Sequence, residues 1–174
     1  SSTVRPGHQE GKEAASVASA IAPLGRVGAG AGATVSKWRG KEFSELGGLG
    51  GATLREGNLI VSCLIAVNAS GDIDFGEYPD KIRNGYFSIP KVNPFENTTI
   101  GVVATNAKLT KSECFLVSQS AHDGYARALF PAHTSGDGDA VVVAATGKVP
   151  TEMSTIRSLT TLTVETAIKS IANE

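Results

Sequence analysis

The chain contains only two cysteines among its 174 residues, and this scarcity excludes several kinds of protein. Cys63 and Cys114 lie far apart and do not form the paired spacing of a zinc site or of a disulfide scaffold. Cys63 lies in an apolar run, which predicts a buried small hydrophobic residue. The cysteine usage favours a reducing compartment, so we expect a cytoplasmic protein with no metal and no cofactor.

The chain also lacks an excess of charge of either sign and a long hydrophobic segment. Its formal net charge is −1, which provides no electrostatic basis for binding nucleic acid or an anionic membrane. The longest apolar run, residues 59–67, is interrupted by Ser62 and is too short to span a bilayer. The opening residues 1–12 are polar, so no signal peptide is visible. Nucleic acid and membranes are therefore not expected as partners.

Glycine, in contrast, is abundant, with 20 residues that indicate tight turns and close backbone approaches. Strand-like and helical patterns alternate along the chain, which predicts a mixed α/β (α+β) fold. Three helices are predicted from apolar spacing and from start and stop signals. The first covers residues 10–22, the second begins at the capping box Thr110–Glu113 and ends before Pro131, and the third runs from residue 154 to the end. The non-helical segments are predicted as a strand hairpin over 53–67, strands at 99–104 and 140–145, and a glycine-rich turn at 47–51. Residues 71–97 are predicted as a long loop, which is either functional or disordered. The run 140–145 is almost entirely apolar, which is typical of a strand buried on both faces.

Thr98 is the first candidate for chemistry, because the polar pair Asn97-Thr98 directly precedes an apolar strand. A β-branched residue that begins a strand is common, and the residue needs no other explanation. The alternative is that the hydroxyl is a nucleophile that becomes the first residue of a new chain. In that case the free α-amine of the same residue serves as the base.

Two carboxylates, Asp137 and Asp139, lie in a glycine-containing segment just before the apolar run 140–145. A strand end can aim side chains at a site while the sheet holds them, and close carboxylates shift each other's pKa. Taken alone, the segment is better explained as a simple turn, whereas a calcium loop would need more ligands than it offers. His133 is expected to hydrogen-bond the loop that carries the aspartates.

Lys37 and Asn68 are two further candidates. Lys37 follows a glycine-packed segment and precedes Trp38, so it is expected to be partly buried rather than a solvated surface lysine. Asn68 ends the strongest predicted strand, where it is either a turn former or an amide donor to a developing oxyanion.

The glycine-rich segment Gly28–Ala33 formally matches a dinucleotide-binding fingerprint. Its context does not fit, because no clear strand precedes it and the residues after it do not read as a helix. A backbone that must approach another backbone closely is the better interpretation. A nucleotide-binding or non-catalytic α/β domain that uses this segment remains the alternative function.

Six segments together resemble the DmpA-type self-cleaving amidohydrolases, a family of N-terminal-nucleophile enzymes that includes aminopeptidases and the nylon-oligomer endo-hydrolase. The segments run in family order, and they are Gly28–Trp38, Gly47–Gly50, Ala66–Asp72, Asn97–Asn106, Ala121–Arg127 and Pro131–Asp139. Threonine after Asn97 and the pair Asp137 and Asp139 most resemble the nylon-oligomer hydrolase branch. Serine and glutamate stand at these places in the β-aminopeptidases.

This resemblance implies an amide-bond hydrolase that matures by self-cleavage between Asn97 and Thr98. Thr98 would then attack a peptide or oligoamide substrate and form an acyl-enzyme. In the same scheme Asn68 would stabilise the oxyanion and Lys37 would assist the nucleophile. Asp137 and Asp139 would orient the Thr98 amine and Lys37.

The resemblance also implies a four-layer α-β-β-α sandwich of which this chain is the C-terminal part. Residues 1–174 would form a single partial domain, in which 1–97 ends the α-subunit-like part and 98–174 is the β-subunit-like part. Members of the family carry a long segment ahead of the part matched here, and in the nylon-oligomer branch it supplies an active-site tyrosine. We therefore expect that this segment or another chain completes the site, and that the protein is a homo-oligomer.

Overall fold

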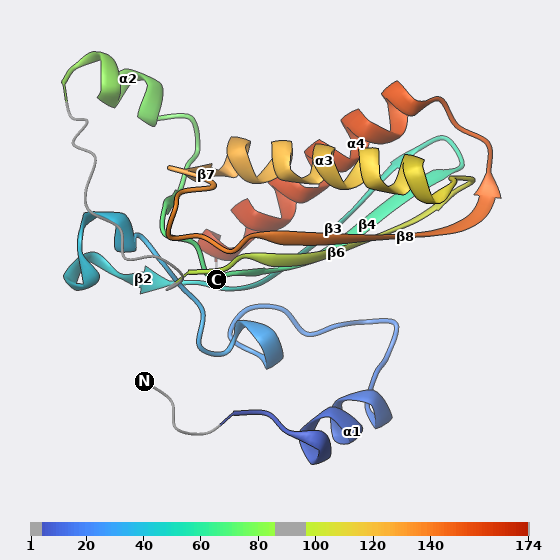
Figure 1. The fold of residues 1–174 in the computed structure, drawn as a ribbon, viewed down its shortest axis with the longest axis horizontal. Helices are drawn as coiled ribbons and strands as arrows, with labels where there is room; N and C mark the ends of the chain where they lie inside the picture. Colours follow the sequence, from blue (N-terminus) through green and yellow to red (C-terminus); the bar gives the residue numbers. More distant parts are fainter. Residues whose placement is uncertain (1–4, 86–96, 174) are drawn as a thin grey trace.

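A four-stranded mixed sheet forms the centre of the computed structural model, which describes residues 5–85 and 97–173 (Figure 1). The strand order is β3-β4-β6-β8, in which β4 pairs antiparallel with β3 and β6 whereas β8 runs parallel to β6. The strands of this sheet are β3 (Gly48–Glu56), β4 (Leu59–Val67), β6 (Ile100–Ala107) and β8 (Ala140–Val149). Two short antiparallel pairs lie toward one end of it, β1 (Thr34–Val35) with β2 (Glu45–Leu46) and β5 (Asp72–Ile73) with β7 (Leu129–Phe130).

Two long helices, α3 (Lys111–Ala128) and α4 (Met153–Ser170), lie side by side on one face of the sheet (Figure 1). The other helices are α1 (His8–Ser16), on the opposite side of the sheet, and α2 (Tyr78–Arg83) at its end. Short 3-10 turns are η1 (Gly28–Gly30), η2 (Lys37–Arg39), η3 (Lys41–Phe43) and η4 (Ile171–Asn173). Within residues 5–85 and 97–173, no helix combines the length and apolar composition needed to cross a membrane.

The predicted capping box begins α3, which confirms that prediction. The backbone N–H of Thr110 donates to Glu113 Oε2 over 2.7 Å, and the Glu113 N–H donates back to Thr110 Oγ1 over 3.3 Å. Helix α3 then carries the chain from β6 toward β8. A helical crossover of this kind is what allows two successive strands of a sheet to run parallel.

The hydrophobic core lies between the sheet and the two helices. Alternate residues of β4 and β6 face the helices, and Val61, Ile65 and Val103 are fully buried there. Helix α4 packs on β3 and β4 and helix α3 packs on β8, which closes this layer. Burial of this apolar surface is the main term that stabilises the arrangement.

Cys63 faces the same core, as predicted for a small hydrophobic residue. Its thiol lies 3.6 Å from the carbonyl oxygen of Thr163 in α4, and burial raises the pKa of the thiol to about 12. Both Cys63 and Cys114 are free thiols.

The opposite face of the sheet is open, and the prediction that residues 140–145 are buried on both faces is wrong. Val142 is 66% exposed and Ile100 is 48% exposed, and both point away from the helices. An entirely apolar run cannot distinguish a strand covered on one face from a strand covered on both. This face therefore presents apolar side chains that the described residues cover only in part.

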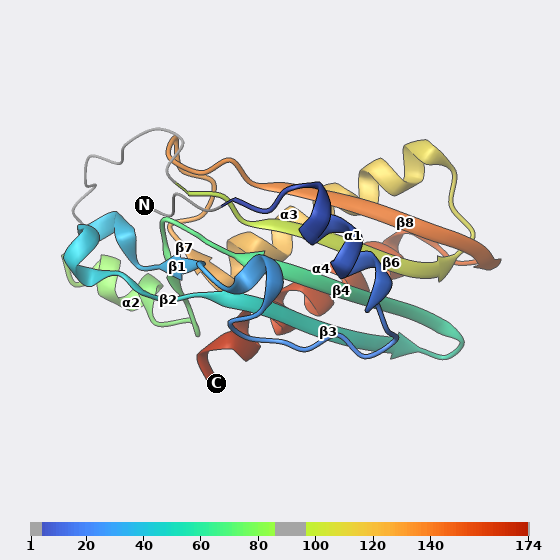
Figure 2. The same cartoon turned by 90° about the horizontal axis from the view of Figure 1, so that it is seen from below.

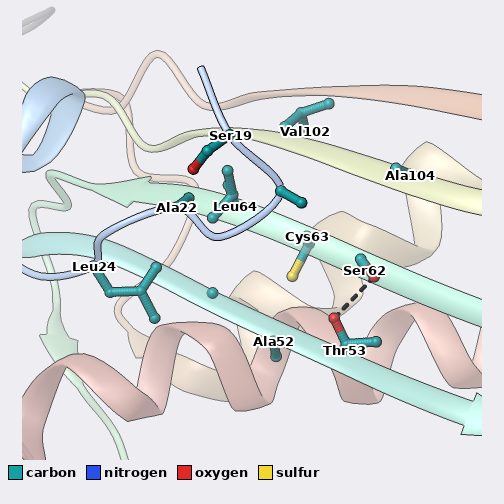
Figure 3. Close-up of a pocket in the computed structure, with 12 residues that line it drawn as sticks. Ser19, Ala22, Leu24, Ala52, Thr53, Ser62, Cys63, Leu64, Val102 and Ala104 are labelled. Atoms are coloured by element: carbon teal, nitrogen blue, oxygen red, sulfur yellow. Dashed lines mark hydrogen bonds between the residues drawn. The ribbon is translucent and has the colours of Figure 1, made fainter. Parts of the chain in front are cut away.

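The segment after α1 provides that partial cover. Figure 2, which is seen from this side, shows the segment in front of the sheet near β3, and Figure 3 shows Ser19, Ala22 and Leu24 over the strands. A pocket with a volume of about 480 Å³ lies between this segment and the strands. A Cβ on Gly51 would lie 2.8 Å from Leu24 Cδ2, so glycine at this position lets the segment approach the strand.

Three other predictions of secondary structure need correction. Residues 48–51 belong to strand β3 and do not form a turn. Their glycines let other backbones approach the strand, since a Cβ on Gly50 would overlap the backbone of Ala167 in α4. The first helix ends at Ser16 and buries no side chain, so no packing extends it to residue 22. The predicted loop 71–97 contains β5 and α2, and its residues 86–96 lie outside the described part of the chain.

Gly124, in α3, is expected to be a sensitive position for stability. A Cβ on this residue would lie 2.8 Å from the Thr161 carbonyl oxygen and 2.8 Å from Val164 Cβ, both in α4. Gly124→Ala must therefore push the helices apart, and we expect the free energy of unfolding to fall by about 1–3 kcal/mol. Urea denaturation measures this. Gly11→Ala, at an exposed position with no atom within 4 Å, is the control and should not lower stability; equal midpoints for the two variants would contradict the expectation.

Candidate functional site

The predicted site residues converge at one end of the central sheet because of the directions of its strands. Asn68 follows the carboxyl end of β4, whereas Thr98 precedes β6 and Asp139 precedes β8. Since β4 is antiparallel to β6 and β8 is parallel to β6, these three strand ends meet at the same edge. Lys37, in turn η2, reaches this edge through Asn68.

The peptide unit between Asn97 and Thr98 is held by hydrogen bonds from several sides. The Thr98 N–H donates to the Asn68 carbonyl oxygen over 2.9 Å, and the Asn97 N–H donates to the Gly136 carbonyl oxygen over 3.1 Å. The Asn97 carbonyl oxygen accepts the N–H of Gly138 over 2.9 Å and the hydroxyl of Thr98 over 2.6 Å. The carbonyl that precedes Thr98 is therefore polarised by two donors, one of which is the Thr98 hydroxyl itself.

Asn68 connects Lys37 with Thr98. Its side-chain oxygen accepts from Lys37 Nζ over 2.9 Å and from the Thr34 N–H over 3.1 Å. Its backbone oxygen accepts the Thr98 N–H. The two donors occupy the oxygen of the amide, which leaves its NH₂ group as the end that can donate to another acceptor.

The two aspartates fasten the loop before β8 to the rest of the site. Asp137 Oδ1 accepts the N–H of Ser70 over 2.9 Å, and its Oδ2 accepts the N–H of Thr134 over 3.0 Å. Asp139 Oδ1 accepts the N–H of Thr99 over 2.9 Å. The carboxylates thus contact the residue after Thr98 and the segment after Asn68. Their expected role toward the Thr98 amine and Lys37 stays a prediction.

His133 hydrogen-bonds the aspartate loop, as expected from the sequence. Its Nδ1 lies 2.8 Å from Asp139 Oδ2, and this hydrogen bond raises the pKa of His133 above its usual value although burial opposes the shift. Burial lowers the pKa of the neighbouring His122, and the charge of His133 lowers it further.

Sequence reasoning did not identify Gly138 or the backbone of Asn68 as parts of the site. Gly138 provides an N–H to the Asn97 carbonyl, and a Cβ at this position would lie 2.9 Å from Thr98 Oγ1. The one available signal was a glycine between two candidate aspartates. Backbone groups leave no trace in the residue types, so their contribution emerges only from the folded chain.

A pocket with a volume of about 270 Å³ opens beside Thr98. Apart from Asn68 and Thr98 its lining is apolar and mostly small, and comprises Ala29, Gly32, Ala33, Ala66 and Ile100. Among the residues described, no group of three or more His, Cys, Asp and Glu side chains is arranged to hold a metal ion.

The glycine-rich segment does not have the geometry of a nucleotide site. Gly28–Gly30 forms one 3-10 turn, and the two-residue strand β1 follows it where a dinucleotide fold requires a helix. A Cβ on Gly30 would overlap the backbone of Leu49 in β3. This glycine therefore serves the close backbone approach that the sequence predicted.

Solved structures of other proteins share the fold of this chain. The chain superimposes on a protein from Pyrococcus horikoshii OT3 with a TM-score of 0.71 and 22% identity, over 95% of this chain and 49% of that one. It also matches an L-aminopeptidase D-Ala-esterase/amidase from Ochrobactrum anthropi, a variant of the Ntn-hydrolase fold, with a TM-score of 0.59 and 18% identity, over 84% and 44% of the two chains. The mixed α/β fold of this chain is thus shared with these two structures.

Sequence comparisons identify the family. Peptidase family S58 matches residues 2–174, and the chain belongs to this family. It is 34% identical over 148 residues to an uncharacterized aminopeptidase of Mycobacterium leprae (strain TN), covering 75% of this chain and 39% of the relative. It is 27% identical over 174 residues to a 6-aminohexanoate-oligomer endohydrolase of Paenarthrobacter ureafaciens, covering 87% and 48%. The chain therefore spans less than half the length of these relatives, and the family resemblance inferred from the sequence is confirmed.

Proposed function

We propose that this protein is an amide-bond hydrolase that cleaves itself between Asn97 and Thr98 and then uses Thr98 as an N-terminal nucleophile. The observation that carries the proposal is the position of the Thr98 hydroxyl, which lies 2.6 Å from the carbonyl oxygen of Asn97. The same carbonyl oxygen also accepts the Gly138 N–H. A nucleophile and a donor to the developing oxyanion thus meet at one peptide bond.

Self-cleavage follows from this arrangement in two steps. Thr98 Oγ1 attacks the carbonyl carbon of Asn97, the bond to the Thr98 nitrogen breaks, and the hydroxyl proton passes to that nitrogen. Water then hydrolyses the resulting ester, which leaves a carboxylate on Asn97 and a free α-amine on Thr98. The Gly138 N–H stabilises the negative charge on the Asn97 oxygen during the attack.

The mature site would hydrolyse a substrate amide by the same chemistry. The α-amine of Thr98 takes the proton of its own hydroxyl, and the hydroxyl oxygen attacks the substrate carbonyl carbon. The substrate C–N bond breaks, the proton passes to the leaving amine, and water then hydrolyses the acyl-enzyme ester to a carboxylate and the free hydroxyl. The amide NH₂ of Asn68 is the proposed donor to the substrate oxyanion, and Lys37 fixes that amide through its oxygen. Asp137 and Asp139 hold the loop that carries Gly138.

The substrate class we propose is a small peptide or oligoamide with an uncharged, apolar acyl part. The pocket beside Thr98 supports this, because its lining contains no charged side chain. The related 6-aminohexanoate-oligomer endohydrolase acts, by its name, on such an oligoamide. A panel of peptides, β-peptides and aliphatic oligoamides offered to the cleaved protein tests the assignment.

We further propose that a chain segment beyond these residues, or another chain, covers the open face of the sheet. Ile100, Val102 and Val142 are exposed there, although large apolar side chains normally find cover. The relatives are more than twice as long as the parts that match, which leaves room for such a segment.

The experiment that tests self-cleavage is intact-mass spectrometry of the purified protein over time. Two pieces that meet at Asn97 and Thr98 support the proposal. A single chain that persists under all conditions tested argues against it.

Lys37→Met provides a further prediction, since it keeps most of the length of the side chain but removes its charge and its hydrogen bond to Asn68. We expect substrate hydrolysis to slow at least about 100-fold, because the amide of Asn68 loses one of the donors that hold its oxygen and orient its NH₂ group. Lys12→Met makes the same change on the exposed helix α1 and should retain the original rate. Equal rates for the two variants would refute the role of Lys37.

A further inference from the structure

The carboxylate of Asp139 connects the nucleophile segment with His133. Its Oδ1 accepts the N–H of Thr99, the residue after Thr98, over 2.9 Å, and its Oδ2 lies 2.8 Å from His133 Nδ1. The side chain of Asp139 is only 5% exposed, and a buried carboxylate requires partners for both oxygens. The position of the Thr99 N–H therefore depends on how the other oxygen of the same carboxylate is held.

The ring of His133 lies between two oxygen acceptors. Besides Nδ1 at Asp139, its Nε2 lies 3.3 Å from the backbone carbonyl oxygen of His122. A carboxylate and a carbonyl oxygen both accept and cannot donate, so the ring satisfies both when each of its nitrogens carries a proton. That protonation state is the imidazolium cation.

Other groups around His133 agree with a charged ring. The ring of Tyr125 stacks on it at a centroid distance of 5.9 Å, and the ring of His122 lies 5.0 Å away. The nearby charges of Asp139 and Asp137 raise the pKa of His133, whereas the pKa of His122 is lowered despite the carboxylates of Asp139 and Asp123. Of the two adjacent histidines, His133 is therefore the one that holds the proton.

The backbone conformation at His133 restricts which residue types can occupy this position. Its φ is +53°, in the left-handed region that asparagine and histidine enter more readily than most residues. Asparagine at this place keeps the backbone conformation and can offer a neutral N–H donor at the position of Nδ1. The substitution His133→Asn thus separates the positive charge from the hydrogen bond.

We propose that His133, as an imidazolium, is a positioning residue that holds Asp139 against the Thr99 N–H and thereby keeps Thr98 in the geometry for attack. The inference rests on the proposed function of Thr98. When His133 loses its proton, Nε2 presents a lone pair to the His122 carbonyl and the ring leaves its place. Both self-cleavage and hydrolysis then slow as the pH rises through the titration of His133.

The first test is independent of cleavage and uses the Thr98→Ala variant with NMR. The amide resonance of Thr99 is expected to titrate with the same midpoint as the His133 ring, whose pKa the hydrogen bond to Asp139 raises above its usual value. This titration is expected to disappear in Thr98→Ala/His133→Asn. A Thr99 amide that ignores the His133 titration, or that still follows it after His133→Asn, would overturn the proposal.

The second test is the pH profile of self-cleavage. At pH 6 the rate for His133→Asn is expected to be on the order of 10-fold below that of the unsubstituted protein. The two rates should converge at high pH, where the His133 ring of the unsubstituted protein is neutral and neither protein carries a positive charge at this position. His8→Asn, at the exposed start of α1, removes another histidine and should keep the original profile.

The outcomes separate the two proposals. A His133→Asn protein with the original rate and profile overturns the positioning role while the function of Thr98 stands. A protein that never cleaves, but whose Thr99 amide follows His133, retains the positioning network and overturns the proposed function instead.

Discussion

Thr98→Ala is expected to leave the chain in one piece, whereas Thr98→Ser is expected to yield two pieces, cut between residues 97 and 98. Alanine removes the hydroxyl that lies 2.6 Å from the Asn97 carbonyl oxygen, and no attack on that carbonyl can follow. Serine keeps the hydroxyl and loses only a methyl group. Intact-mass spectrometry over a time course distinguishes the two variants, and the alanine variant should also be inactive on every amide substrate.

A protein variant that has lost its fold would give the same negative result, so both variants need a stability measurement. Thr98 is partly buried just before β6, and neither change removes much apolar surface. Similar urea midpoints for both variants are therefore expected. Cleavage of the Thr98→Ala protein at the same bond would contradict the mechanism outright.

Gly138→Ala is expected to slow self-cleavage by about 10- to 100-fold with little change in stability. The new methyl carbon would lie 2.9 Å from Thr98 Oγ1 in the present geometry, so the hydroxyl must move away from it. The backbone N–H that donates to the Asn97 carbonyl is retained. A displacement of the nucleophile by a fraction of an ångström to 1 Å is enough to cause a loss of this size.

The rate of appearance of the two pieces, fitted at several temperatures, measures this effect. Gly11→Ala is a suitable control, because its methyl carbon meets no atom within 4 Å. Gly138 is exposed, so thermal unfolding of the two variants should be similar. A Gly138→Ala protein that cleaves at the original rate would show that the hydroxyl does not need its present position.

Local signals in the sequence predicted those parts of the fold that depend on neighbouring residues. The capping box of Thr110 and Glu113 determines where α3 begins, and the turn at Gly57 joins β3 to β4. The failures concern features that distant residues decide. Gly50 lies in a strand because α4 packs against it, and Val142 is exposed because no described segment covers it.

The same distinction applies to the candidate site. The resemblance to a known family predicted that Lys37, Asn68, Thr98 and the aspartates form one site, and the strand directions bring the ends of β4, β6 and β8 to one edge. The partners of each side chain could not be predicted, because Ser70, Thr99 and Gly138 contribute backbone N–H groups. Any residue type other than proline could provide such a group.

The position of β6 in the middle of the sheet has a consequence for the life of the protein after a cut at Asn97. One piece would carry β3 and β4, and the other would carry β6, β8, α3 and α4, yet all of them share one core. The pieces would stay together as long as the core is intact. Once separated by denaturant they would have to find each other again, so recovery would depend on protein concentration. The cut protein would then stay folded because it unfolds slowly, not because it refolds readily. The rate of unfolding would determine how long it stays active.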